Sequence, residues 1–360
     1  MILPATSSPP WLPGPSRFAL AWTLPLAIAA AAWVSPWAAW GVGVLVQVGL
    51  ALLERVPGNA RSPQAVPASR WFALVLWVHA PLQFALLGIG AGVAATLQDS
   101  TLAGWGAVLA LGIAVGGVTG SQGITFAHEL GHSRRRFDRA LAWLLMASVN
   151  YSHFMVEHYR GHHPRAATRD DPASARRGES LWRFLPRTLV GSWRSAWRLE
   201  SQRLRQFGLA WWRSTLLWAT VGQGVWLGLL VAWLGQAALL FWLVQSAYAV
   251  FLLETINYIE HYGLRRREVG GRVEPFGMMH AWNADHCLTN CFVVNLQRHS
   301  DHHLHAWKPY PELQALPGPQ LPTGYAGCLL LATIPPLWFK LMHPRLAALP
   351  PILQAQPGPS

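Results

Sequence analysis

The stretch His128-Glu129-Leu130-Gly131-His132 has the HExxH spacing of hydrolytic zinc sites. Residues four apart lie on one face of a helix, so both imidazoles can reach one metal ion. The glutamate between them can act as a general base on a metal-bound water. Five residues do not decide between this chemistry and another use of the same spacing. The chain has fifteen histidines, however, and the positions of the others narrow the choice.

Most of the other histidines also stand in regularly spaced clusters. EHYRGHH contributes HxxxHH, LQRHSDHH contributes HxxHH, and NYIEHYGL adds one histidine at the end of an apolar segment. At spacings of three or four, each cluster is expected to present two or three imidazoles toward one point. Together with HELGH they supply nine imidazoles: His128, His132, His158, His162, His163, His261, His299, His302 and His303.

Nine imidazoles are more than one zinc ion can use, because zinc is four-coordinate and a catalytic zinc keeps one position open. The number therefore favours two metal ions with open positions for oxygen. Imidazole binds iron, copper, nickel and zinc, so the ligand type alone does not choose the metal. An extended zinc-protease motif, HExxHxxGxxH, also fails here, since Arg135 and Asp138 stand where its glycine and third histidine belong. A membrane zinc metalloprotease and a metal-binding transporter remain as distant alternatives.

The composition indicates the elements that must position these histidines. The chain is 52% hydrophobic and 12% charged, whereas soluble domains are about a quarter charged. Four long blocks carry no charge, and a bilayer-spanning helix needs about 20 apolar residues. The sequence therefore predicts an all-α integral membrane protein with about six transmembrane helices and a His-rich cap. The spans are expected at about residues 18–34, 37–53, 71–95, 103–127, 213–233 and 237–258.

The arginines predict the orientation of these spans. The joins near Pro36, Asp99 and Gly235 have no Lys or Arg, whereas the joins on the other side are rich in Arg. The positive-inside rule then places both termini and the histidine clusters in the cytoplasm. The formal charge of +12 is explained by this topology and by anionic headgroups, so nucleic-acid binding is not expected. A membrane setting favours oxidative chemistry on an apolar substrate.

Several longer motifs resemble one known family. HELGH, EHYRGHH, NYIEHYGL and LQRHSDHH, in this order, resemble the membrane alkane hydroxylases, which are alkane 1-monooxygenases within the wider class of membrane fatty-acid desaturases and hydroxylases. The segment PQLPTGYAGCLLLATIPPLW resembles the same branch. The expected organisation is a disordered N-terminus (1–16), a membrane di-iron monooxygenase domain (17–346) and a flexible C-terminal tail (347–360).

The resemblance implies a non-haem di-iron centre, with two Fe held by the nine histidines. It implies hydroxylation of the terminal carbon of medium- or long-chain n-alkanes with O2. Electrons would come from rubredoxin, which is reduced by an NAD(P)H-dependent reductase. Rubredoxin would be a separate chain, because the three cysteines form no CxxC pair. The expected location is the bacterial inner membrane. Alternatives with the same centre are hydroxylation of an alkylbenzene methyl group, as in xylene, or of a terpene, and fatty-acyl desaturation.

Other polar residues near the clusters could orient the ligands. Carboxylates beside metal-bound imidazoles fix their orientation and offset metal charge, and neutral amides can act similarly. Some of these groups could instead cap helices or meet solvent. The candidates are Glu129, Glu157, Asn257, Glu260, His280, His286, Asn290 and Asp301.

Overall fold

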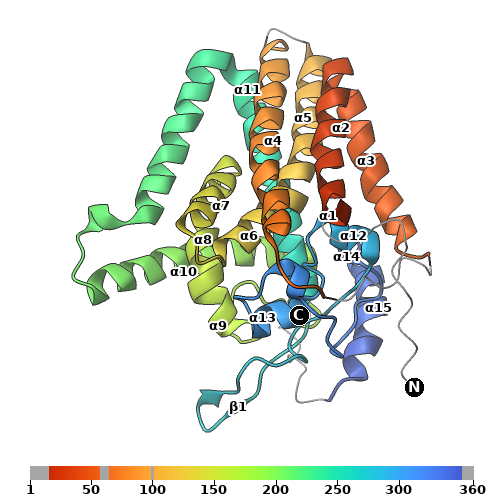
Figure 1. The fold of residues 1–360 in the computed structure, drawn as a ribbon, viewed down its shortest axis with the longest axis vertical. Coiled ribbons are helices and arrows are strands. Elements are labelled where there is room, and N and C mark those ends of the chain that lie inside the picture. The colour runs from red at the N-terminus through yellow and green to blue at the C-terminus, as the bar shows by residue number, and fades with distance from the viewer. Residues whose placement is uncertain (1–15, 57–64, 99–100, 351–360) are drawn as a thin grey trace.

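The computed structural model describes residues 16–56, 65–98 and 101–350, and these residues are mainly helical (Figure 1). The expectation of a disordered N-terminus lies almost wholly outside the described residues, as does that of a flexible tail beyond residue 350. A two-stranded hairpin, β1 (Glu268–Val269) and β2 (Arg272–Val273), projects at the end remote from the long helices.

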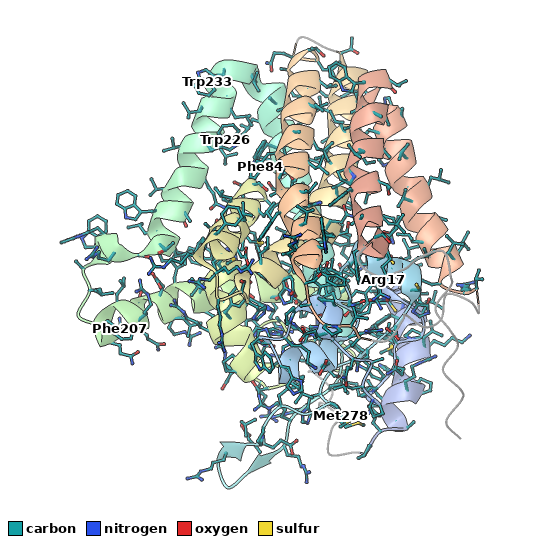
Figure 2. The ribbon with its side chains drawn as sticks, viewed as in Figure 1. Arg17, Phe84, Phe207, Trp226, Trp233 and Met278 are labelled. Atoms are coloured by element: carbon teal, nitrogen blue, oxygen red, sulfur yellow. The ribbon has the colours of Figure 1, made fainter. Side chains whose placement is uncertain are left out.

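Within the described residues, five helical segments are long and apolar enough to cross a membrane, which confirms the predicted fold class. The first joins α1 (Ser16–Ala19), a short 3-10 turn and α2 (Thr23–Val34). The others are α3 (Pro36–Leu53), α4 (Arg70–Ala95), the helix Leu102–Gly131 and α11 (Thr215–His261). Figure 1 shows α2 to α5 standing side by side. Large apolar side chains on their outer faces are exposed, as a lipid-facing surface requires; Phe84 and Trp233 are two that Figure 2 labels.

The predicted hairpin near Pro36 has a clear local cause. Ser35 is extended, and its side chain accepts a hydrogen bond from the Ala38 backbone N–H. Pro36 occupies the first turn of α3, where a missing N–H costs nothing. Capping serine and proline together end α2 and begin α3.

The long helix α11 contains the predicted spans 213–233 and 237–258 as two arms. Gly235, with φ of 81°, breaks the helix between them. Gln98 at the end of α4 accepts a hydrogen bond from the Ala237 N–H, so it caps the second arm. Figure 1 shows the first arm leaning away from the bundle, while the second arm returns alongside α4 and α5.

The second arm of α11 packs closely on α5 (Leu102–Val118). Gly112, Gly116 and Gly120 follow at four-residue spacing, and a Cβ atom at each would lie only 2.7 Å from Val244, Gln245 or Ala249. Small residues at this spacing let two membrane helices approach closely. The approach brings the end of α11 beside α6 (Thr125–Gly131), which continues α5 through a π-helical turn at Thr119–Ile124.

A helical hairpin that the sequence did not predict inserts between the long helices. Helix α7 (Arg136–Ser148) runs toward α4 and α11, and α8 (Phe154–Glu157) returns. Gln245 of α11 donates to the Ser148 carbonyl, and Gln223 donates to the Ser152 hydroxyl. Irregular backbone beside membrane spans needs such protein partners, because lipid offers none.

The C-terminal part forms the cap beneath the spans. It contains α12 (Cys287–Phe292), α13 (His299–Leu304), α14 (Tyr325–Ala332) and α15 (Pro335–Ala347). Glu54, just after α3, is buried there and accepts hydrogen bonds from the Thr289 and Thr323 hydroxyls and from the Ala326 and Gly327 N–H groups. This carboxylate therefore ties a predicted span to the cap.

Candidate metal centre

Four segments far apart in the chain bring the nine histidines together. They are α6 with its C-terminal cap, the π-helical turn His158–His162 with α9 (His163–Arg165), the end of α11, and α13. One group contains His128, His132, His158, His163 and His302, and the other contains His162, His261, His299 and His303. Within each group the nearest ligand atoms lie within 4.8 Å of one another, so each group could hold a metal ion.

The grouping differs from the expectation that each cluster converges on one point. His158 and His163 belong to one group and His162 to the other, while His302 and His303 are divided in the same way. The reason is geometric: adjacent residues on a helix point in directions about 100° apart. Each HH doublet therefore contributes one imidazole to each group. The π-helical turn brings His158 and His163, five residues apart, within 3.0 Å through their Nε2 atoms.

The ring nitrogens of these histidines are arranged to bind metal ions rather than to hydrogen-bond to one another. Nε2 atoms of different histidines lie 3.2 Å apart between His299 and His261 and 3.3 Å apart between His302 and His163. Among the described residues, Nε2 of His132, Nε2 of His162 and both ring nitrogens of His303 are buried without a hydrogen-bond partner. Buried polar atoms are rarely left unpaired, and convergent unpaired imidazoles are what a metal site requires.

Burial favours the neutral form that binds metals at several of the nine histidines. It lowers the pKa of His132 to about 3 and holds the pKa values of His158 and His163 well below their usual range, with further lowering by neighbouring histidines for the latter two. Burial acts likewise on the pKa values of His302 and His303. Neutral imidazole has a free nitrogen lone pair, so the site is ready for a cation at neutral pH.

The four-histidine group is held from outside by oxygen atoms. Asp171 Oδ2 lies 2.9 Å from His162 Nδ1, and Glu260 Oε1 lies 3.1 Å from His299 Nδ1. His261 Nδ1 is 3.3 Å from the His280 carbonyl oxygen. Such contacts leave Nε2 of each ring directed at the metal position. We see no carboxylate contact of this kind for the five-histidine group among the described residues.

Asp171 was missed by the sequence analysis. Its carboxylate is buried, which opposes ionisation, but the charge and hydrogen bond of His162 and a hydrogen bond from Ser174 lower its pKa to about 2. Its only signal in the sequence is an Asp-Asp pair nine residues after His162 in a chain with 16 acidic residues. Spacing alone could not find it, because a loop carries it back to the histidine.

The other candidate orienting residues lie near the centre but bond elsewhere. Glu129 accepts from the Tyr310 N–H, Glu157 pairs with Arg165, and Asn257 donates to Glu254. Asp301 binds His305 and Lys308. The His280 ring contacts Glu274, so only its carbonyl faces a clustered histidine. Asn290 donates to Asp285, and His286 belongs to neither histidine group.

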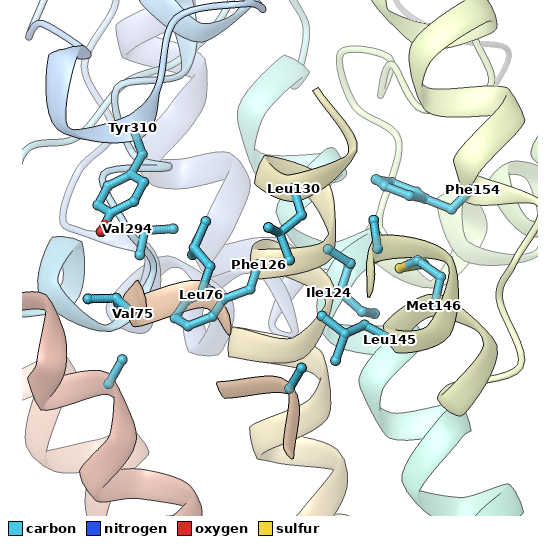
Figure 3. Packing of buried hydrophobic residues seen from close by; sticks show 14 of the residues in the cluster. Val75, Leu76, Ile124, Phe126, Leu130, Leu145, Met146, Phe154, Val294 and Tyr310 are labelled. Atoms are coloured by element: carbon cyan, nitrogen blue, oxygen red, sulfur yellow. The ribbon is translucent and has the colours of Figure 1, made fainter. Parts of the chain in front are cut away.

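An apolar core fixes the two segments that carry His128 and His158. Phe126 and Leu130 of α6 pack with Leu145 and Met146 of α7 and with Phe154 of α8 (Figure 3). The Phe154 ring also stacks on His158, with centroids 4.6 Å apart. Replacing a buried phenylalanine by alanine costs about 3–5 kcal/mol. The core therefore holds the imidazoles in place independently of any metal.

A cavity of about 280 Å³ runs from the spans to the histidines. Its walls are mainly apolar side chains and glycines of α2, α3, α5 and α11, including Ile28, Val44 and Leu252. At its inner end it reaches His128 and His158 of one group and His299 of the other. Trp40 and Val44 of α3 belong to its lining and are also partly exposed on the outer surface of the spans.

This sequence is similar to those of several known proteins. A family model described as fatty acid desaturase matches residues 103–329. Alkane 1-monooxygenase 2 of Pseudomonas aeruginosa is 40% identical over 314 residues, which cover 84% of this chain and 82% of the relative. Alkane 1-monooxygenase of Pseudomonas putida is 36% identical over 87% of this chain and 81% of its own. The xylene/toluene monooxygenase hydroxylase component XylM of Pseudomonas putida is 30% identical over 62% of this chain and 60% of its own.

Proposed function

The chain belongs to the fatty acid desaturase family and, within it, to the alkane 1-monooxygenases, and we propose that it is a non-haem di-iron monooxygenase that hydroxylates the terminal carbon of medium- or long-chain n-alkanes. The nine histidines would hold two iron ions, one in each group. Iron bound there would supply the O2 activation and oxidising power that a terminal C–H bond demands.

The cavity is the observation that supports an n-alkane as the substrate. Its lining is mainly apolar and extends from Trp40 and Val44 of the spans to His128 and His158 of one histidine group and His299 of the other. Each CH2 group buried in such a cavity contributes about 0.8 kcal/mol, so an unbranched hydrocarbon gains affinity with every carbon it inserts. Its terminal methyl group would then lie nearest the histidines.

The chain's own residues position the substrate and the ligands. Ile28, Val44 and Leu252 exclude water along the cavity, and Trp40 stands where its lining meets the outer surface of the spans. Asp171 holds His162 by a hydrogen bond at Nδ1, and Glu260 lies beside Nδ1 of His299. Tyr325 donates a hydrogen bond to Glu260, which in turn fixes that carboxylate.

The proposal includes the location and the redox partner. We place the chain in the bacterial inner membrane with both termini and the histidines on the cytoplasmic side, because the arginines gather on that side of the spans. Electrons would come from a separate rubredoxin and its NAD(P)H-dependent reductase. The relationship to alkane 1-monooxygenases supports a redox partner, and the exposed basic residues Arg134, Arg136 and Arg267 would suit an acidic one.

A second substrate class is favoured by one relative. XylM, a xylene/toluene monooxygenase component, is 30% identical over the part it shares with this chain. Its similarity is lower and shorter than that of the alkane 1-monooxygenases, so we rank an alkylbenzene methyl group behind an n-alkane. A xylene molecule would also fill less of the cavity than a long n-alkane.

The test combines metal content with product analysis. The full chain is purified in detergent and its metals are measured by elemental mass spectrometry; about two irons per chain are expected, falling in His162→Ala. Membranes supplied with rubredoxin, reductase and NADH are then given octane, hexadecane, xylene or a fatty acid. The 1-alkanol should form from an alkane. One zinc and no iron, or products only from xylene or the fatty acid, would contradict the proposal.

A further inference from the structure

Helix α10 (Leu181–Gln206) has a surface that the proposed reaction does not use. It lies crosswise to the spans at the level of the histidine segments (Figure 1). One face, including Phe184, Thr188, Ser195 and Glu200, is buried against the protein. The rest of the helix divides into two further faces of opposite character.

The second face is apolar and mostly exposed, with Trp197 half-buried at its edge. Pro186, Val190, Trp193 and Trp197 follow at spacings of three or four, so they form one stripe. Val190 is 49% exposed and Trp193 is 52% exposed. The stripe continues past the helix end with Phe207, labelled in Figure 2, and with Trp211 and Trp212, which are all more than half exposed. Tryptophans are enriched where a membrane meets water.

The third face is basic. Arg187, Arg194, Arg198 and Arg205 follow at spacings of seven, four and seven, which also places them in one stripe. Arg187 binds Glu179, but Arg194, Arg198 and Arg205 are exposed and make no ion pair with the described residues. A helix with one apolar and one arginine-rich exposed face is typical of the interface of an anionic membrane.

The position of α10 relative to the spans agrees with this surface. Glu200 near its end accepts a hydrogen bond from Ser214, the residue that caps α11. The candidate span Thr215–His261 therefore starts where α10 is fastened. This contact fixes the end of α10 beside the start of that candidate span.

From these contacts we infer that α10 lies in the headgroup layer on the histidine side of the membrane and binds anionic phospholipids through Arg194, Arg198 and Arg205. Its apolar stripe inserts among the acyl chains next to the headgroups, and its arginines bind the lipid phosphates. The negative headgroups complement the positive stripe, and zwitterionic lipids do so less.

The bound lipid also steadies the metal centre. Arg165, two residues after His163, donates to Ser195 of α10 at 2.8 Å and pairs with Glu157. Arg160 pairs with Glu200. The segment that carries His158, His162 and His163 is therefore fastened to the buried face of α10, and it keeps a fixed depth below the membrane surface.

The experiment is native mass spectrometry of the full chain in detergent with equal amounts of phosphatidylglycerol and phosphatidylcholine. Wild-type protein should retain phosphatidylglycerol preferentially. Arg194→Gln/Arg198→Gln should weaken that retention on the order of twentyfold, at about fivefold per arginine. The variant Arg194→Lys/Arg198→Lys should keep the preference for phosphatidylglycerol, because it keeps both positive charges. Arg169→Gln/Arg272→Gln is the matched control, because both are exposed and lie on the side of the β-hairpin.

Three outcomes would overturn the inference. They are equal retention of the two lipids by wild type, unchanged retention in Arg194→Gln/Arg198→Gln, or displacement of the lipid by millimolar inorganic phosphate. The last would indicate a free-phosphate site. Hydrogen exchange at residues 158–163 gives a second readout, which phosphatidylglycerol should slow in wild type and in the control but not in the Gln/Gln variant.

Discussion

At the scale of single residues, each HH doublet serves both histidine groups. His162 and His163 separate between the groups, and so do His302 and His303. A shift of either helix turn would therefore disturb both metal positions together. The groups differ in their outer contacts: Asp171 and Glu260 face the four-histidine group, and the negative charge of Asp171 offsets part of the charge of a cation there.

Replacing Asp171 by Asn should weaken metal retention at the four-histidine group. The change removes the charge behind His162 and costs about 10- to 100-fold in metal affinity, which is typical for such contacts. During a chelator titration, the iron content should fall toward about half that of wild type before the remainder leaves. The matched control is Asp170→Asn, whose side chain is exposed. Equal loss from Asp170→Asn and Asp171→Asn would contradict the role of Asp171.

At the scale of elements, the inserted hairpin α7–α8 positions His158. Its turn contains Asn150 with φ of 54°, and the Ser148 carbonyl just before the turn is paired by Gln245 of α11. Gln245 uses its whole amide group: it donates to the Ser148 carbonyl and the Ser246 hydroxyl, and it accepts from the Thr119 hydroxyl. One side chain thus joins the turn, α11 and the helix that leads to His128.

Gln245→Leu should destabilise the protein by on the order of 2 kcal/mol, because it leaves the buried Ser148 carbonyl and Thr119 hydroxyl without their partner. The denaturation midpoint in detergent should fall, and residues 149–158 should exchange amide hydrogens faster. Gln236→Leu, on the same helix but exposed, should leave both unchanged. Similar effects of the two substitutions would argue against the network.

Glu54→Gln should loosen the junction between α3 and the cap. The carboxylate accepts hydrogen bonds from four partners, and an amide would turn an N–H toward some of these donors. A loss on the order of 2 kcal/mol is expected, measured as a lower thermal midpoint. Glu268→Gln on the exposed hairpin should change the midpoint little. An unaltered midpoint in Glu54→Gln would show that the junction is not needed.

At the scale of the whole molecule, spans and cap together enclose the cavity. Its walls come from α2, α3, α5, α11 and α14, while its inner end belongs to the histidine segments. An apolar molecule that entered this cavity from lipid would therefore reach the buried histidines without crossing water. The spans limit the length of hydrocarbon that fits into the cavity, and the cap determines where the end of that hydrocarbon would lie.

Gly43→Ile should shorten the usable cavity. Gly43 lines it, and an added Cβ would meet its nearest atoms only at 3.8 Å, so the larger side chain would fill cavity space. Turnover of hexadecane should fall at least about tenfold relative to octane, a difference of about 1.4 kcal/mol. Gly41→Ile on the same helix is the control, because Gly41 has open space around it. An unchanged hexadecane-to-octane ratio would exclude Gly43 from the substrate path.

The sequence by itself determined the membrane-spanning helices and the set of clustered histidines. Uncharged stretches predict membrane helices because each must be apolar on every side, and that signal is local. The spacings in HxxxH, HxxxHH and HxxHH likewise select eight of the histidines, and the ninth, His261, is indicated by its place at the end of an apolar segment. Their roles as iron ligands remain predictions, since the family relationship and the geometry support but do not measure them.

Only the tertiary structure decided how those residues are shared. It divides each doublet between two groups, returns Asp171 to His162, and inserts α7–α8 among the spans. None of these has a sequence period, because each depends on how helices distant in the chain turn and pack against one another. The direction in which each side chain leaves its helix sets which group an imidazole joins. The glycines of α5 that pack on α11 set the distance between those two helices.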